Sequence, residues 1–188
     1  GANQECGARV DVTTAALVSP AVVGRTVIVA RQPGVIAGLP GVAPTLHAID
    51  ANLAFRAAFD DGAAVKPGDE VGRIEGPAAA ILMAERIVLN LLGHLSGIAT
   101  LAHRYVDAIA GTAANIYDTR KTTPGWRRLE KYAVRCGGGR NHREALFSAV
   151  LIKDNHLALG ADAGGETAGF SPAGAVRRAR QWLEEQHG

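Results

Sequence analysis

The chain has 188 residues, of which 47% are apolar and 20% charged, and its formal net charge is +2. This composition excludes a wholly disordered or collagen-like protein. No uninterrupted apolar stretch approaches the roughly 18 residues that a membrane span needs, so we expect no membrane partner. Two cysteines, Cys6 and Cys136, are too few for a disulfide framework, which favours a reducing, cytoplasmic compartment.

The first third of the chain mixes strand and helix patterns. Residues 25–31 are rich in β-branched side chains and stop at Pro33, which predicts a strand followed by a turn. Residues 42–59 carry apolar side chains at helical spacing, and residues 70–74 alternate like a short strand. Together these elements predict a small α+β unit.

Residues 78–110 follow, with a helical pattern. We expect one broad apolar stripe and a break at Gly97 that separates two helices. The stripe consists of Leu82, Ile87, Leu91, Leu92 and Leu95.

The last part of the chain predicts a strand–helix–strand unit. Residues 115–119 form a short strand pattern, and residues 127–135 form a helix that ends at three consecutive glycines. Residues 149–152 are an apolar run typical of a strand buried on both faces. The spacing suits a βαβ unit. Residues 173–185 predict a final amphipathic helix.

Positive charge is concentrated in residues 120–143, which carry eight Lys or Arg and one acid, a net charge of +7. Basic residues also follow both predicted strands, and the carboxyl ends of parallel strands form active sites in α/β sheets and barrels. We therefore expect Arg120, Lys121 and Lys153 on one rim. So many donors favour a multiply anionic substrate.

The basic residues differ in whether the sequence favours a solvated surface position or a place in a functional site. Arg127, Arg128 and Lys131 fit a solvated helix face better than a site. Lys153 directly follows four apolar residues, and because burying an unpaired lysine is costly, a functional role is favoured over a structural ion pair. His142, beside Asn141, is the one histidine that we expect to have a functional role.

Other motifs predict little. The glycine run at 137–139 is not followed by Lys-Ser/Thr, so it is no P-loop. No histidines pair at i, i+4, which argues against a zinc site, and we assign no protein metal ligand. Cys136 has no identifiable activating base, so we expect an inert thiol.

Six segments of the chain stand out as motifs: ER at 85–86, GHLSGIAT at 93–100, DTRKTTPG at 118–125, KYAVRCGGG at 131–139, NHR at 141–143 and LIKDNH at 151–156. Their order and separations resemble those of the quinolinate phosphoribosyltransferase family. Two of them, the DTRKT-x-PG and LIKDNH segments, are specific enough to make chance agreement hard to credit.

The resemblance implies an α/β fold in two domains. Residues 1–92 would form a small N-terminal α/β sandwich domain, and residues 93–188 the first part of an incomplete α/β barrel of phosphoribosyltransferase type. We expect the chain to be truncated at both ends relative to the family. The family reaction transfers a phosphoribosyl group from phosphoribosyl pyrophosphate to quinolinate, using Mg²⁺, and gives nicotinate mononucleotide, pyrophosphate and CO₂.

The family motif also implies roles for individual residues. Arg86 would reach into the partner subunit's site, so a homodimer is expected. Lys121 and Lys153 would contact substrate anions near the reacting centre and are the expected catalytic residues. The quinolinate carboxylates would be bound by Thr119, Arg120, His142 and Arg143.

Alternative functions stay open from the sequence alone. The chain could be an inactive partial chain that only binds an anionic substrate. Residues 120–143 could instead form a nucleic-acid-binding module, although Trp126 and Tyr132 are their only aromatic residues, few for base stacking. A nicotinate phosphoribosyltransferase that does not decarboxylate is the nearest enzymatic alternative.

Overall fold

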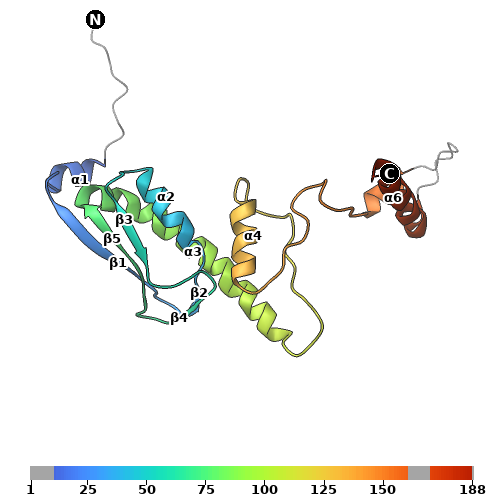
Figure 1. Ribbon diagram of the computed structural model, residues 1–188, viewed down its shortest axis with the longest axis horizontal. Helices are drawn as coiled ribbons and strands as arrows, with labels where there is room; N and C mark the ends of the chain where they lie inside the picture. Colours follow the sequence, from blue (N-terminus) through green and yellow to red (C-terminus); the bar gives the residue numbers. More distant parts are fainter. Residues whose placement is uncertain (1–10, 161–169, 188) are drawn as a thin grey trace, which may run out of the picture. The chain divides into compact units, whose positions relative to one another are not determined.

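The computed structural model describes residues 11–160 and 170–187, so Cys6 lies outside the described residues. The chain divides into two compact units, Gly1–His142 and Arg143–Gly188. The first unit holds both sheets and the helices α1 to α4, and the second holds α5 and α6 (Figure 1).

The main sheet of the first unit has three antiparallel strands in the order β1–β5–β3. These strands are β1 (Val23–Val29), β5 (Glu70–Pro77) and β3 (Ala54–Ala57). A second, two-stranded sheet pairs β2 (Gly34–Val35) with β4 (Ala64–Val65). The strands predicted at 25–31 and 70–74 are confirmed, because β1 and β5 cover most of both ranges.

Two short helices flank these strands. Asp11 caps α1 (Val12–Leu17) by accepting the backbone N–H groups of Thr13 and Thr14 at 3.1 and 3.2 Å. The 3₁₀ turn η1 (Leu39–Gly41) leads directly into α2 (Val42–His47).

The helix predicted over residues 42–59 is wrong beyond His47. The Asp50 carboxylate accepts the backbone N–H of Asn52 at 2.7 Å, a local turn that competes with helix continuation. The chain then enters β3, whose Phe55 lies opposite Ile74 of β5. Pairing with β5 therefore overrides the helical spacing of the apolar residues.

The longest element is α3 (Ala78–Ala108), a single helix of 31 residues. It runs unbroken through Gly97, so the predicted break there is wrong. An interior glycine costs a helix about 1 kcal/mol relative to alanine, and tertiary packing along α3 outweighs this cost. The predicted stripe is also partly wrong, because Leu82 and Ile87 are exposed. The buried positions are Ala80, Ile81, Ala84, Val88, Leu92, Leu95, Ala99 and Ala102.

The two halves of α3 serve different cores. The first half packs with β5 and α2 around Leu46, Leu53 and Val88 (Figure 1). The second half packs against α4 (Arg127–Cys136) through a smaller cluster that includes Leu95, Ala99 and Ala133. By length and composition α3 could also cross a membrane, but core helices of globular proteins pass the same criterion.

The second unit contains α5 (Asp154–Leu159) and α6 (Pro172–His187). The predicted final helix is confirmed by α6. The buried strand predicted at 149–152 is wrong, because these residues form no strand and Val150 and Leu151 are exposed. A strand buried on both faces needs hydrogen-bonded neighbours, and the described residues of this unit offer helices alone.

Candidate functional site

A single parallel bridge between Tyr117 and Arg140 brings two motifs of the first unit together. Asp118 donates its N–H to the carbonyl of Arg140 at 3.1 Å, and Arg140 donates its N–H to the carbonyl of Ile116 at 2.8 Å. The strand predicted at 115–119 is thus reduced to one bridge, and its parallel partner is Arg140 rather than residues 149–152. Because the two segments run in the same direction, residues 118–121 and 141–142 leave the bridge at the same end.

Asp118 is the hub of this arrangement. One carboxylate oxygen, Oδ1, accepts the Lys131 ammonium at 2.5 Å and the backbone N–H of His142 at 2.8 Å. The other, Oδ2, accepts the side-chain amide of Asn141 at 2.5 Å. The Asp118 side chain is only 7% exposed, so the three bonds are made in a nearly dry setting, where they are stronger than in water.

The prediction that Lys131 lies on a solvated helix face is wrong. Its side chain is 3% exposed, and its ammonium also donates to the carbonyl of His142 at 3.0 Å. A buried lysine is tolerated when its charge is paired and its donors are satisfied, as here. Arg128, on the same helix, is exposed as predicted, whereas half-buried Arg127 donates to the Thr122 hydroxyl at 3.2 Å.

Glu130, the neighbour of Lys131 on α4, contacts the chain five residues beyond Asp118, at Thr123. Its Oε2 accepts the backbone N–H of Thr123 at 3.2 Å, and its Oε1 lies 3.0 Å from Nε2 of His94. Burial acts to raise the pKa of Glu130, but the hydrogen bonds with Thr123 and His94 outweigh it and hold that pKa below its usual value.

Arg120 has the feature expected of a ligand-binding group. Its Nε is buried and has no hydrogen-bond partner among the residues described. A buried donor without an acceptor is costly, and a bound anion would satisfy it. Thr119 and Lys121 are exposed beside it, and the hydroxyl of Thr119 accepts the backbone N–H of Lys121 at 3.1 Å. The exposed ring of His142 meets Tyr117 edge-on at 6.4 Å.

The remaining expected residues of the NHR and LIKDNH motifs belong to the second unit. Arg143 donates from Nη1 to the carbonyl of Ala149 at 2.9 Å. Lys153 is exposed where α5 begins, so the argument that it follows a buried strand does not hold. The common rim for Lys153 and the cations of the first unit stays a prediction.

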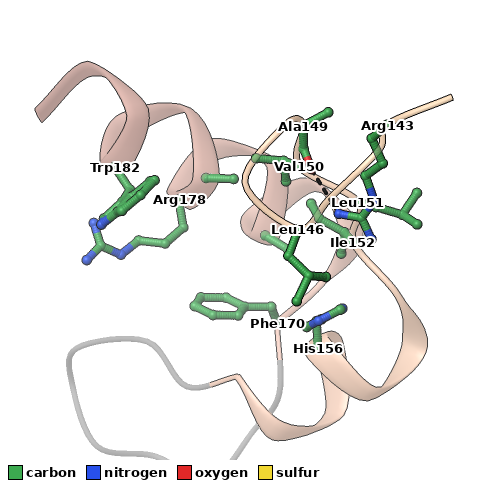
Figure 2. A pocket seen from close by; sticks show the side chains of 12 residues that line it. Arg143, Leu146, Ala149, Val150, Leu151, Ile152, His156, Phe170, Arg178 and Trp182 are labelled. Carbon is green, nitrogen blue, oxygen red and sulfur yellow. Dashed lines mark hydrogen bonds between the residues drawn. The ribbon is translucent and has the colours of Figure 1, made fainter. Parts of the chain in front are cut away.

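A pocket of about 480 Å³ lies within this second unit (Figure 2). Its walls are mainly apolar, with Leu146, Phe170 and Trp182 among them. Arg143 and Arg178 also line it, whereas Lys153 does not. The pocket therefore lacks the dense cationic lining that the sequence predicts for the substrate site.

Arg86 lies on α3, with a side chain 76% exposed and a guanidinium 3.9 Å from the Glu85 carboxylate. An exposed ion pair at this distance contributes little to the stability of the fold. Arg86 is therefore available for another contact, and its role in a partner's site stays a prediction.

Sequence reasoning missed a second link to α4. The Tyr132 hydroxyl donates to Asp61 at 2.8 Å, and the same carboxylate accepts the backbone N–H groups of Gly38 and Leu39 at 2.7 and 3.0 Å. Burial, followed by the hydrogen bond to Asp61, raises the pKa of Tyr132 well above its usual value. No sequence signal joins residues 61 and 132. For Asp118 a signal existed, since it is an acid two residues before the consecutive basic residues Arg120 and Lys121.

The described residues do not supply a ready magnesium site. They contain no group of three or more His, Cys, Asp or Glu side chains placed to hold a metal ion. Asp118, the carboxylate nearest to the motif cations in sequence, already accepts from three donors. These residues therefore do not fit as ligands of Mg²⁺.

Comparison with known proteins identifies the family. Residues 11–96 match the model of the quinolinate phosphoribosyl transferase N-terminal domain, and residues 98–187 match that of the C-terminal domain. The chain belongs to the quinolinate phosphoribosyltransferase family. The two models meet within α3, and the domain boundary between residues 92 and 93 stays a prediction.

Among curated relatives, the nicotinate-nucleotide pyrophosphorylase [carboxylating] of Mycobacterium leprae is 46% identical over 150 residues, which is 79% of this chain and 53% of the relative. A probable enzyme of the same name from Bacillus subtilis is 43% identical over 152 residues, again 79% and 53%. This chain thus spans about half the length of the curated relatives that it matches.

Solved structures agree. NadC from Streptococcus pyogenes superposes with a TM-score of 0.81 at 39% identity, covering 92% of this chain and 58% of that one. The nicotinate-nucleotide pyrophosphorylase from Francisella tularensis superposes with a TM-score of 0.80 at 34% identity, covering 90% of this chain and 57% of that one. These likenesses confirm the predicted fold class, an N-terminal sheet domain followed by part of a barrel-type domain.

Proposed function

We propose that this chain carries the cationic part of a quinolinate phosphoribosyltransferase site. The reaction would transfer the phosphoribosyl group of phosphoribosyl pyrophosphate to quinolinate with loss of CO₂, giving nicotinate mononucleotide and pyrophosphate. The observation that carries the proposal is Arg120. Its Nε is buried and has no hydrogen-bond partner in the described part of the chain, and it lies in a +7 segment of a chain that belongs to this family.

The charge of the site suits these substrates. Quinolinate is a dianion and phosphoribosyl pyrophosphate is more negative still, so the two repel each other when brought together. Fixed cations offset that repulsion, and arginine forks match carboxylates with two parallel hydrogen bonds. In this proposal Thr119, Arg120, His142 and Arg143 bind the two carboxylates of quinolinate.

The residues contribute position and charge rather than covalent catalysis. The quinolinate nitrogen attacks the ribose C1 as the bond to pyrophosphate breaks, and negative charge grows on the departing oxygen. Lys121 and Lys153 would stabilise that charge as catalytic residues. Loss of CO₂ then leaves an electron pair on the ring carbon, which the positive ring nitrogen stabilises until a proton is taken up. Holding both substrates in register is the other contribution of the protein.

Magnesium is proposed as the companion of phosphoribosyl pyrophosphate. Polyphosphate oxygens are typical ligands of Mg²⁺, which often binds through its substrate. We assign no protein ligand to the ion.

A homodimer is proposed in which Arg86 completes the partner's site. Its support is a run of exposed apolar side chains beside Arg86 on α3, namely Leu82, Met83 and Ile87. Exposed apolar patches commonly mark interaction surfaces. We also propose a cytoplasmic location, supported by Cys136, which forms no disulfide with any described residue, since unpaired thiols suit reducing compartments.

The direct test is release of CO₂ from carboxyl-labelled quinolinate by the intact protein with phosphoribosyl pyrophosphate and Mg²⁺. We expect release that needs all three additions. Lys153→Ala should lower it by about 10²-fold if Lys153 meets developing charge. No release from a folded protein would contradict the proposed function, and product from nicotinate in place of quinolinate would favour the enzyme that does not decarboxylate.

A further inference from the structure

Two consecutive residues of α4, Glu130 and Lys131, hold opposite ends of one short loop. We call residues 119–122 the cationic loop, because it contains Arg120 and Lys121. Lys131 bonds to Asp118, immediately before the loop, and Glu130 accepts the backbone N–H of Thr123, immediately after it.

The same helix also contacts the last residue of the loop. Arg127, one turn earlier on α4, donates to the hydroxyl of Thr122 at 3.2 Å. Three side chains of α4 therefore fix the cationic loop just before it begins, at its last residue and just after it ends. The side chains of Thr119 and Lys121 stay exposed.

We propose that Glu130 and Lys131 are positioning residues, which set the conformation of the cationic loop before substrate binds. This inference rests on the proposed function, in which Thr119, Arg120 and Lys121 meet substrate. Lys131 is too deeply buried to meet substrate itself, so its effect on binding must pass through Asp118 and the backbone.

The helix is itself firmly held, as a positioning element must be. Ala133 is fully buried against α3 in the smaller core cluster. Tyr132 is bonded to Asp61, which in turn caps the backbone at Gly38 and Leu39. The cationic loop is therefore anchored, through α4, to the packed core. Support of this kind lowers the entropy lost on binding.

Lys131 also couples the cationic loop to His142. Its ammonium donates to the carbonyl of His142, and Asp118 accepts the N–H of the same residue. One ion pair thus fixes the backbone on both sides of the bridge between Tyr117 and Arg140. Loss of Lys131 should disturb Arg120 and His142 together, although neither side chain is altered.

The test compares Lys131→Met with Arg128→Met in the intact protein. Both variants remove one positive charge from α4, but Arg128 is exposed, whereas Lys131 is buried against Asp118. The first readout is hydrogen exchange at the amides of Lys121 and Thr123. The second is the KM for quinolinate, which a variant that is merely less stable would leave unchanged in its folded fraction.

With Lys131→Met we expect exchange at both amides to quicken, and the KM for quinolinate to rise by about 10- to 100-fold. The KM for phosphoribosyl pyrophosphate should change less. Arg128→Met should leave exchange and both KM values as in the wild type. Unchanged exchange and an unchanged quinolinate KM in folded Lys131→Met would overturn the proposal.

If Lys131→Met does not fold, the double variant D118N/K131M takes its place, because it leaves no buried charge unpaired. We expect it to fold with a raised quinolinate KM, and a wild-type KM would overturn the proposal. A wild-type protein without turnover would count against the proposed function instead. Hydrogen exchange would then still decide whether Lys131 orders the loop.

Discussion

Glu130 is kept in its ionised form by the groups around it. Its carboxylate joins the end of the cationic loop, at Thr123, to His94 on α3. Because hydrogen bonds hold its pKa below the usual value of 4.5, the ionised form is favoured in the folded protein. Ionised Glu130 therefore stabilises the fold above pH 4.5, and this contribution is lost as the pH falls through the lowered pKa.

We predict that Glu130→Gln removes this acid sensitivity. At pH 7 the variant should be less stable than the wild type in urea unfolding. The difference in free energy of unfolding should shrink as the pH falls from 5 towards 3, because the wild type loses the advantage of its charge. Glu184→Gln, at an exposed position on α6, is the matched control. A difference that stays constant over this pH range would contradict the assignment.

Lys131 shows that the sequence alone does not reveal which basic residue of a segment is buried. The count of basic residues correctly identifies a +7 segment, but it does not distinguish Arg128, which faces water, from Lys131, which is buried. The difference depends on where α4 meets Asp118, thirteen residues away. Long-range pairing of this kind leaves no local pattern.

At the level of secondary-structure elements, the end of α4 approaches α3 so closely that only glycine fits at position 137. A Cβ at Gly137 would lie 2.2 Å from the carbonyl oxygen of Ala99, a distance that real atoms do not adopt. A Cβ at Gly97, inside α3, would meet no described atom within 4 Å beyond its chain neighbours and the adjacent backbone of its own helix. The two glycines thus serve opposite roles in the same pair of helices.

Alanine substitutions at these two positions should therefore have opposite signs. We predict that Gly137→Ala destabilises the protein by about 1–3 kcal/mol, because α4 must shift away from α3. Gly97→Ala should stabilise it by about 0.5–1 kcal/mol, the usual gain in helix propensity. Urea unfolding of both variants measures this. Equal effects of the two substitutions would contradict the packing described.

The elements also show which predictions a pattern supports. The 3.6-residue period correctly predicts the helical character of residues 78–110 and 127–135, because each helix buries one face. It fails at residues 54–57, where pairing with β5 decides the structure. A different pattern, the continuous apolar run, fails at residues 149–152, where no described strand lies beside the run and none forms.

On the scale of the whole molecule, the motifs predict the family and the fold class, and both are confirmed. They do not give the distance between cations in different units, so the shared rim of Lys153 and Arg120 stays a prediction. The chain covers about half of its curated relatives, and its activity is therefore a proposal.

The central claim is that fixed cations of this chain bind a dianion, and titration of the protein with quinolinate tests it most directly. We predict saturable binding that Arg120→Gln weakens by about 10- to 100-fold, since a charged hydrogen bond is worth about 1.5–3 kcal/mol. Arg128→Gln, with the same change of charge on the exposed face of α4, should bind as the wild type does. Equal affinities of the two variants for quinolinate would contradict the account.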